Sequence, residues 1–392
     1  MDGRTCFAGF ASLLLLPALA APAAVDGARL EGLKARSIGP AGMSGRIAAI
    51  DAFAGDPRIV WVGAASGGVW KSTNGGLTFE PVFDEQPVHA IGAVAVDPRT
   101  PDVVWVGTGE GNLRNSISHG DGVWVTRDGG KTWANVGLAK TERIHRILLH
   151  PRDPGTAWAC AVGPAWNDGP ERGVFRTTDG GKSWKKVLHV DAKTGCADLV
   201  LDPGNPDHLL AAMWDFRRTP HHFRSGGPGS GLHVTWDGGE SWTRLGEREG
   251  VPKGTLGRIG LAFCEGHPEV VYAVVEAEKN VLLRSENGGR RFEVVNDSPS
   301  VNPRPFYYAD IRVDPGQPNR VYSLATQLRV STDGGKTFEN LRGTGRQHVH
   351  VDHHALWIDP REPRRMFLGN DGGMYESRDR GETFRFVGTL PL

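Results

Sequence analysis

Residues 126–133 read Thr-Arg-Asp-Gly-Gly-Lys-Thr-Trp, and seven copies of this pattern decide the fold of the chain. The general form is Ser/Thr-x-Asp/Asn-x-Gly-x-Thr/Ser-aromatic, which we call the box motif. The fifth copy is degenerate, because Arg291 replaces the second Ser/Thr. A recurrence at a nearly fixed period has to be interpreted before any single element. The copies begin at residues 72, 126, 177, 235, 285, 331 and 377, so the intervals are 54, 51, 58, 50, 46 and 46 residues.

Each box motif predicts a tight turn between two strands. Its Asp or Asn can accept hydrogen bonds from backbone N–H groups within the turn. Its Gly supplies a positive φ at little steric cost. The aromatic residue then begins the outgoing strand and can bury its ring under the turn. The box residues are therefore predicted to be structural.

The repeating unit contains four predicted strands. An apolar run ending near Asp-Pro, such as 91–98, comes first in each unit. A second β-rich run, such as 103–107, comes next, and the strands that enter and leave the box complete the four. Four short strands about every 50 residues are typical of a β-propeller blade. Gly 54, Pro 26 and Trp 12 in 392 residues suit such a turn-rich protein. The sequence predicts an all-β, seven-bladed propeller with a box hairpin at the outer rim of each blade and little helix.

The boxes resemble the Asp-box, or bacterial neuraminidase repeat. The surrounding sequence resembles a bacterial family of secreted propellers related to the sortilin (VPS10) N-terminal domain. This resemblance implies the propeller fold, and it also implies that relatives often continue into a second propeller. The stretches that carry it are 38–40, 44–46, 107–110, 114–116, 225–231, 305–308, 352–360 and 369–373.

The chain is predicted to be exported to the periplasm or the extracellular space. Residues 1–20 read as a signal peptide, with an apolar run from Phe7 to Leu19 and a small-residue cleavage site at Ala18-Leu19-Ala20. Residues 21–43 are a predicted linker, and residues 44–392 are the predicted propeller. No later stretch is long and apolar enough to suggest a membrane span in the mature chain. Lys+Arg 45 balances Asp+Glu 45, which argues against nucleic acid as a partner.

Three cysteines remain after the leader: Cys160, Cys196 and Cys264. All three fall in predicted strands. Because the number is odd, at least one thiol is unpaired or one pair is intermolecular. Their spacing forms no CxxC metal site, and the sequence leaves the pairing open.

The densest polar stretch is 348–354, His-Val-His-Val-Asp-His-His. If it were a strand, alternate side chains would share a face, so His348, His350, Asp352 and His354 would point the same way. Such a set is a candidate site for a divalent metal, although no cofactor is predicted outright. The alternative interpretation is a hydrogen-bonded polar cluster that lines the central channel.

A second polar stretch replaces the short turn of other blades at 109–116. Glu110 is a candidate general acid and Arg114 a candidate anion clamp, while the alternative is a loop held by an internal Glu–Arg pair. Other candidate positions are the predicted loop 214–231, the stretches 166–168 and 171–172, and Tyr307-Tyr308. We predict one polar site from blades seven, one and two. Its ligand-binding candidates are Arg46, Glu110, Arg114, Asn115, His350, Asp352, His353 and His354.

Two classes of function compete. The first is a binding module for a glycan, a peptide or a protein, since sortilin-like domains bind peptides. The second is a glycoside hydrolase, which needs two carboxyl groups facing each other across a bond. Glu110, Asp198, Asp310 and Asp352 are the inner-strand candidates, with Glu110 and Asp352 the strongest, but nothing in the sequence pairs them. The sialidase residue set cannot be assembled here. Tandem-propeller xyloglucanases place one catalytic carboxylate on each propeller, so a single propeller would lack half of that machinery. We therefore expect binding rather than catalysis.

Overall fold

The computed structural model describes residues 45–346 and 349–392. The chain divides into two units, Met1–Ile38 and Gly39–Leu392, and the fold described here is that of the second unit. The predicted leader (1–20) and linker (21–43) lie outside the described residues.

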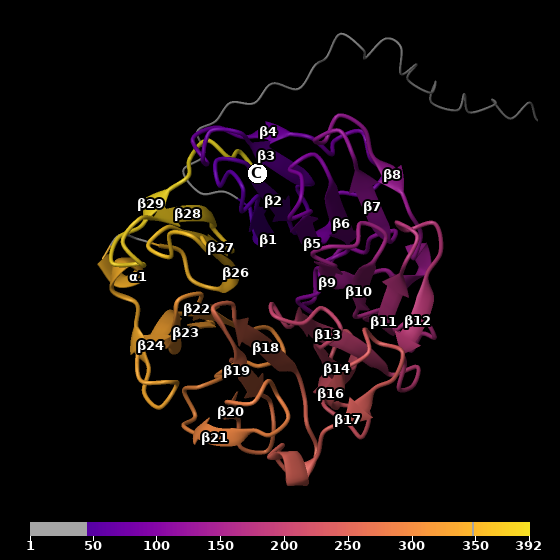
Figure 1. The fold of residues 1–392 in the computed structure, drawn as a ribbon, viewed down its shortest axis with the longest axis vertical. Helices are drawn as coiled ribbons and strands as arrows, with labels where there is room; N and C mark the ends of the chain where they lie inside the picture. Colours follow the sequence, from indigo (N-terminus) through magenta and orange to yellow (C-terminus); the bar gives the residue numbers. More distant parts are fainter. Residues whose placement is uncertain (1–44, 347–348) are drawn as a thin grey trace, which may run out of the picture. The chain divides into compact units, whose positions relative to one another are not determined.

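Seven antiparallel sheets, each built from consecutive strands, surround a central channel (Figure 1). The all-β, seven-bladed propeller is therefore confirmed. The inner strands are β1 (Ile47–Ala52), β5 (Ile91–Val96), β9 (Ile144–Leu149), β13 (Thr194–Leu201), β18 (Ile259–Cys264), β22 (Asp310–Asp314) and β26 (His353–Ile358). The second strands are β2 (Val60–Ala64), β6 (Val104–Thr108), β10 (Ala157–Ala161), β14 (Leu209–Arg218), β19 (His267–Val275), β23 (Gln317–Leu324) and β27 (Met366–Asn370).

The outer half of each blade contains the box hairpin. The third strands are β3 (Val69–Ser72), β7 (Val123–Thr126), β11 (Gly173–Thr177), β16 (Gly231–Thr235), β20 (Val281–Ser285), β24 (Leu328–Ser331) and β28 (Gly373–Ser377). The outermost strands are β4 (Glu80–Pro81), β8 (Ala134–Asn135), β12 (Lys185–Leu188), β17 (Thr243–Arg244), β21 (Glu293–Asn296), β25 (Glu339–Asn340) and β29 (Arg385–Phe386). Every box begins at the last residue of a third strand and forms the turn to an outermost strand, as predicted, but its aromatic residue lies just before that strand rather than on it.

Little else interrupts the repeat. Strand β15 (Phe223–Ser225) pairs with the extended end of β14. The predicted loop 214–231 is thus wrong in part, because much of it is a β-hairpin. The helical segments of the described residues are the 3₁₀ helices η2 (Ala139–Thr141) and η3 (Glu247–Glu249) and the five-residue α1 (Arg342–Arg346). Within the described part of the chain, no helix has the length and apolar character needed to span a membrane.

The second box shows how the turn is held. The backbone N–H of Gly130 donates to Thr126 Oγ1 at 2.8 Å, and that hydroxyl donates to Asp128 Oδ1 at 2.8 Å. The same carboxylate accepts the backbone N–H of Thr132 at 2.9 Å and its hydroxyl at 2.7 Å. Accepting these bonds lowers the pKa of Asp128 to about 2. The box carboxylates are thus engaged within their own turns.

The boxes also join neighbouring blades. Lys71 in blade one donates to the Gly129 carbonyl in the next box at 2.8 Å, and Arg127 donates likewise to Gly180 at 3.1 Å. The box aromatic Trp133 reaches back to donate to Val82 O at 2.6 Å, and its ring meets Trp61 edge-on. The rings therefore pack between blades rather than only under their own turns. A disulfide between Cys160 and Cys196 links blades three and four, whereas Cys264 is buried and free.

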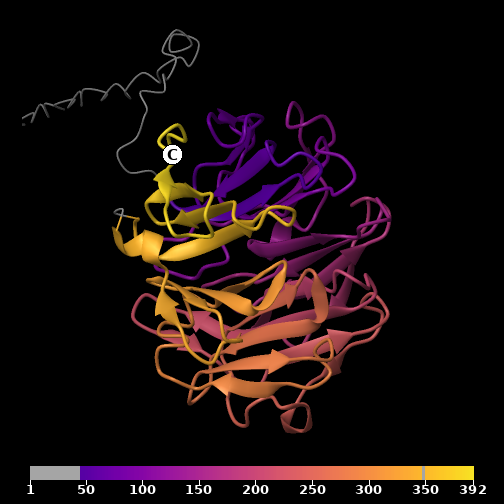
Figure 2. The same cartoon turned by 60° about the vertical axis from the view of Figure 1, so that its left-hand side comes forward.

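The ring closes through side-chain contacts between the first and last blades. Strands β1 and β26 are neighbours, yet blades one and seven share no strand among the described residues. Side chains from both blades form one apolar cluster around Ile47, Phe79 and Phe367. The contact between the first (indigo) and last (yellow) blades is visible in Figure 2.

Candidate functional site

Polar residues gather at the channel mouth where the inner strands begin. Arg46 immediately precedes β1, and its Nε lies 2.7 Å from Glu110 Oε1, while its Nη2 donates to Oε2 at 2.8 Å. Glu110 follows β6 and is only 1% exposed. Gly109 makes this position available, because its φ is +83° and a Cβ there would lie 1.9 Å from the carbonyl oxygen of Glu142. The partner of Glu110 is thus Arg46 rather than Arg114, which the internal-pair alternative had named.

Asp371, in the turn between β27 and β28, is the centre of the cluster. His354 Nε2 lies 2.9 Å from Asp371 Oδ1, and the Tyr307 hydroxyl donates to Oδ2 at 3.3 Å. Arg46 Nη1 and Arg114 Nη1 approach the two carboxylate oxygens, each at 3.6 Å. The carboxylate is 19% exposed and Arg114 is 37% exposed. Sequence reasoning missed Asp371 as a site residue, although 369–373 was among the stretches that carry the family resemblance.

The two carboxyl groups of the cluster have opposite pKa shifts. Burial raises the pKa of Glu110 to about 7, although Arg46 and Arg114 oppose the rise. Burial alone would also raise the pKa of Asp371. The hydrogen bond from His354 and the charges of Arg46 and Arg114 outweigh burial there, so the pKa of Asp371 is lowered. Near neutral pH, Asp371 is ionised while Glu110 is close to its titration point.

A buried network beneath the cluster fixes the His354 tautomer. Arg258 can only donate, and its Nη2 donates to Asn112 Oδ1 at 2.8 Å. Asn112 therefore presents its NH₂ group to His354 Nδ1, 3.3 Å away, and that nitrogen must accept. The proton then resides on Nε2 and points at Asp371. Burial lowers the pKa of His354, so the ring is neutral and orients the carboxylate.

The prediction of a strand through 348–354 is wrong. Strand β26 begins only at His353, and Asp352 has a φ of +67°, which breaks the alternation of side chains. Tyr308 donates a hydrogen bond to Asp352, and His350 Nδ1 lies 2.8 Å from its neighbour's carbonyl, Val351 O. His354 instead contacts Asp371. The candidates His350, Asp352 and His354 therefore do not converge on one metal position.

The remaining candidates are placed as follows. His353 is buried, and Asn115 is exposed in the loop that carries Arg114. His348 lies outside the described residues. In the described part of the chain, no group of three or more His, Cys, Asp and Glu side chains is placed to hold a metal ion. Asp198 and Asp310, the other two inner-strand carboxylates, both form ion pairs with Arg146.

Loops from several blades cover this mouth of the channel. Leu113 is fully buried and packs with Trp214 and Phe216, and Phe306 packs against the same cluster. Blades two, four and six thus contribute to one apolar cap. The cap holds the Arg114 loop and the neighbouring Tyr307 in place, and the accessible part of the site is the group of Arg46, Arg114 and Asp371.

Known proteins resemble this chain in two ways. The profile of the family described as "Sortilin, neurotensin receptor 3" matches residues 121–253. Xyloglucanase Xgh74A from Acetivibrio thermocellus is 32% identical over 353 residues, which are 77% of this chain and 39% of that protein. A xyloglucanase from Hypocrea jecorina is 28% identical over 212 residues, which are 48% of this chain and 24% of that protein. The chain therefore spans well under half the length of these curated relatives.

The fold comparison agrees. The crystal structure of the GH74 xyloglucanase from Xanthomonas campestris matches with a TM-score of 0.63 at 17% identity. The match covers 90% of this chain and 55% of that chain. At this identity the likeness concerns the fold alone. The chain is thus a seven-bladed propeller related to the sortilin domain and to the xyloglucanases.

Proposed function

We propose that this chain is a carbohydrate-active propeller that hydrolyses a glycan at the Asp371 site. The observation that carries the proposal is the pair of carboxyl groups, Glu110 and Asp371, which a single guanidinium, that of Arg46, bridges. Their pKa values are shifted in opposite directions, which is the arrangement that assigns one group as acid and the other as base. The names of the curated relatives favour hydrolysis over simple binding, and they suggest a xyloglucan-type β-glucan as substrate.

The roles follow from the protonation states. Glu110, with a pKa of about 7, would donate a proton to the leaving glycosidic oxygen. Asp371 is ionised and would act as the second carboxylate of the reaction. Arg114, which is partly exposed, would hydrogen-bond sugar hydroxyls, and the buried Tyr307 would hold Arg114 and Asp371 in position. Because Glu110 is almost fully buried behind Arg46, productive binding requires Arg46 to leave Glu110 and turn toward Asp371 or the sugar.

The second candidate is a binding module without catalysis. Burial of Glu110 in its ion pair with Arg46 favours it, because binding requires only the accessible groups on Arg46, Arg114 and Asp371. The match to the sortilin family profile supports this alternative as well. In both cases the ligand contacts Arg114 and Asp371, and only hydrolysis also requires contact with Glu110.

We further propose that the protein acts outside the cytoplasm. The Cys160–Cys196 disulfide supports export, since disulfides persist in oxidising compartments. The signal peptide over residues 1–20 stays a prediction.

The first prediction separates the two candidates. Incubation with xyloglucan and other β-glucans should release reducing ends, and Asp371→Asn and Glu110→Gln should each reduce the rate at least about 100-fold. Calorimetric titration with xyloglucan oligosaccharides measures binding separately. Glu278→Gln, at an exposed position in the β19–β20 turn of blade five, a turn that contributes no residue to the Asp371 site, is the control and should leave both measurements unchanged. Binding that Arg114→Ala weakens, without release of sugar, would identify a binding module; neither binding nor release would overturn the carbohydrate proposal.

A further inference from the structure

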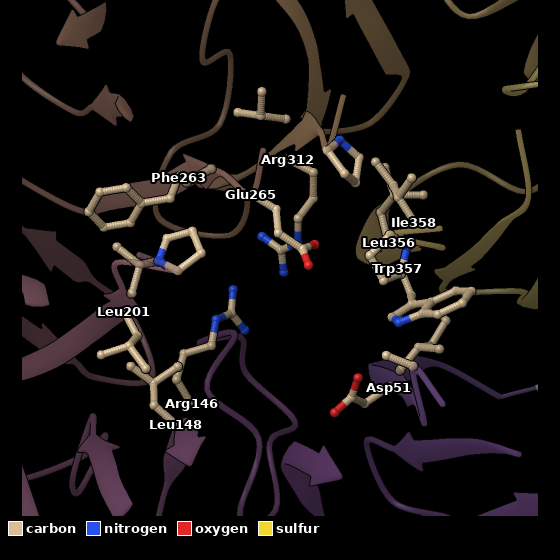
Figure 3. Close-up of a pocket in the computed structure, with 18 of the residues that line it drawn as sticks. Asp51, Arg146, Leu148, Leu201, Phe263, Glu265, Arg312, Leu356, Trp357 and Ile358 are labelled. Carbon is tan, nitrogen blue, oxygen red and sulfur yellow. The ribbon is translucent and has the colours of Figure 1, made fainter. Parts of the chain in front are cut away.

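A cavity lies at the opposite mouth of the channel, where the inner strands end (Figure 3). Its volume is about 530 Å³, and residues at the ends of all seven inner strands contribute to its wall. A cavity of this size can enclose a small organic molecule. It is separate from the Asp371 site, whose residues lie where the inner strands begin.

The wall of this cavity is largely apolar. Leu148, Leu201, Phe263, Trp357 and Ile358 line it, and all five are only partly buried. Apolar surface of this kind gains free energy when a ligand removes it from water, at roughly 25 cal/mol per Å². The cavity therefore favours a ligand with an apolar body.

The two arginines that face the cavity already have carboxylate partners. Arg146 Nε donates to Asp198 at 2.9 Å, and its Nη2 donates to Asp310 at 3.0 Å. Arg312 also pairs with Asp310, on the other side of that carboxylate. These four charges compensate one another, so the arginines supply little attraction for an anion.

Two carboxylates of the wall lack a cation. Asp51 accepts backbone N–H groups from Ala52 at 2.9 Å and Val96 at 2.8 Å, but it forms no ion pair with any described residue. Glu265 forms neither a hydrogen bond nor an ion pair in the described part of the chain. Burial raises the pKa of Asp51 to about 6, and burial with the nearby Asp359 charge raises that of Glu265. A bound cation would therefore relieve an uncompensated cost.

We propose that this cavity binds an organic amine, a cation with an aliphatic or aromatic body. The ammonium group would pair with Asp51 and lie against the ring of Trp357, which Figure 3 shows on the same part of the wall. These two residues belong to β1 and β26, which pack directly against each other. A carboxylate beside an aromatic face is a favourable environment for an ammonium ion. The apolar body would extend toward Leu201 and Phe263.

Three probes that differ only in head group test this proposal. Octylammonium, octanol and octanoate share one chain, so calorimetric titration of the full chain compares their heads directly. We expect octylammonium to bind at least about tenfold more tightly than either of the others. Asp51→Asn should reduce its affinity to that of octanol and leave octanol binding unchanged. The proposal is overturned if octanoate binds most tightly, if the three bind alike, or if none binds.

Three further variants test the amine proposal, even if Asp51→Asn does not fold. If Asp51→Asn fails to fold, Glu265→Gln at the exposed edge of the cavity should still weaken octylammonium binding several-fold, and no effect would count against the proposal. Leu201→Lys places a cation in the cavity and should abolish octylammonium binding. Asp371→Asn, at the other mouth, should leave it unaltered; a loss there would show that the amine occupies the carbohydrate site instead.

Discussion

His353 is an unsatisfied residue next to the candidate site. Its ring is buried, and Nδ1 finds no hydrogen-bond partner among the residues that the structure describes. Burial is the main cause that lowers its pKa to about 3, and the neighbouring histidines add to the shift. The side chain therefore stays neutral in the folded protein at pH values where an unfolded chain would protonate it.

This shift makes the free energy of unfolding depend on pH. Between about pH 6.5 and pH 3 the unfolded chain binds a proton at residue 353 and the folded chain does not, so stability falls as pH falls. His353→Phe removes that proton uptake, and we expect a flatter decline of stability between pH 7 and pH 4.5. Urea denaturation at several pH values measures the slope.

The control for this prediction is His221→Gln, which replaces an exposed histidine and should leave the slope unchanged. Glu110 contributes with the opposite sign, because its pKa is raised to about 7 and stability is lost as pH rises from about 4.5. Each variant must therefore be compared with the parent protein at the same pH values. An identical slope for His353→Phe and the parent would contradict the buried neutral histidine.

At the scale of single elements, the box turns allow a graded test of the hydrogen bonds that hold them. Asp333 accepts the backbone N–H of Thr337 at 3.0 Å and its hydroxyl at 2.6 Å. Asp333→Ala should lower the free energy of unfolding by about 1–2 kcal/mol, because these bonds are lost in an exposed turn. Asp333→Asn should lower it less, since Asn287 makes the equivalent backbone bond in the fifth box at 2.9 Å. Denaturant unfolding measures both, and equal losses would show that the carboxylate charge dominates.

Such turns could be predicted from sequence because their determinants are local. Each box has its donors and acceptors within eight residues, so the pattern alone predicts the hairpin and its place in the blade.

The stretch 348–354 could not be predicted in this way. Its alternation suggested a strand, yet Asp352 is held at positive φ, with its carboxylate bonded to Tyr308 of another blade. A contact over 44 residues determines the start of β26, and periodicity cannot reveal it.

At the scale of the whole molecule, closure of the ring explains why the remaining residues of the candidate site lie close together. Arg46, Glu110, Tyr307 and Asp371 come from blades one, two, six and seven, and only closure of the ring brings them together. Sequence position did predict that loops of blades seven and two meet beside blade one. It could not show that a turn aspartate, rather than Asp352, receives the hydrogen bond from His354. Which carboxylate accepts the hydrogen bond from His354 depends on the directions of side chains across the channel mouth.

Closure itself depends on few polar contacts. Arg365 in blade seven is 8% exposed, and its Nη1 donates to Pro57 O in blade one at 2.8 Å. Its Nη2 donates to the first box at Gly75 O, 3.4 Å away, and its guanidinium lies over the Phe367 ring. Arg365→Leu removes these bonds and leaves buried carbonyl groups unpaired, so we expect a loss of about 2–4 kcal/mol. Denaturant unfolding measures it.

Hydrogen exchange locates the effect. Blades one and seven, unlike the other neighbouring blades, are not consecutive in the chain, so only non-covalent contacts join them. Arg365→Leu should therefore speed amide exchange in β1 and β26 more than in β13 and β18, whose blades flank the opposite side of the ring. Arg127→Leu is the matched control, since Arg127 makes a similar bond to the next box from an exposed position and should cost under about 1 kcal/mol. If exchange rises equally in all seven blades, the ring opens as one cooperative unit and the first–last interface is no weaker than the others.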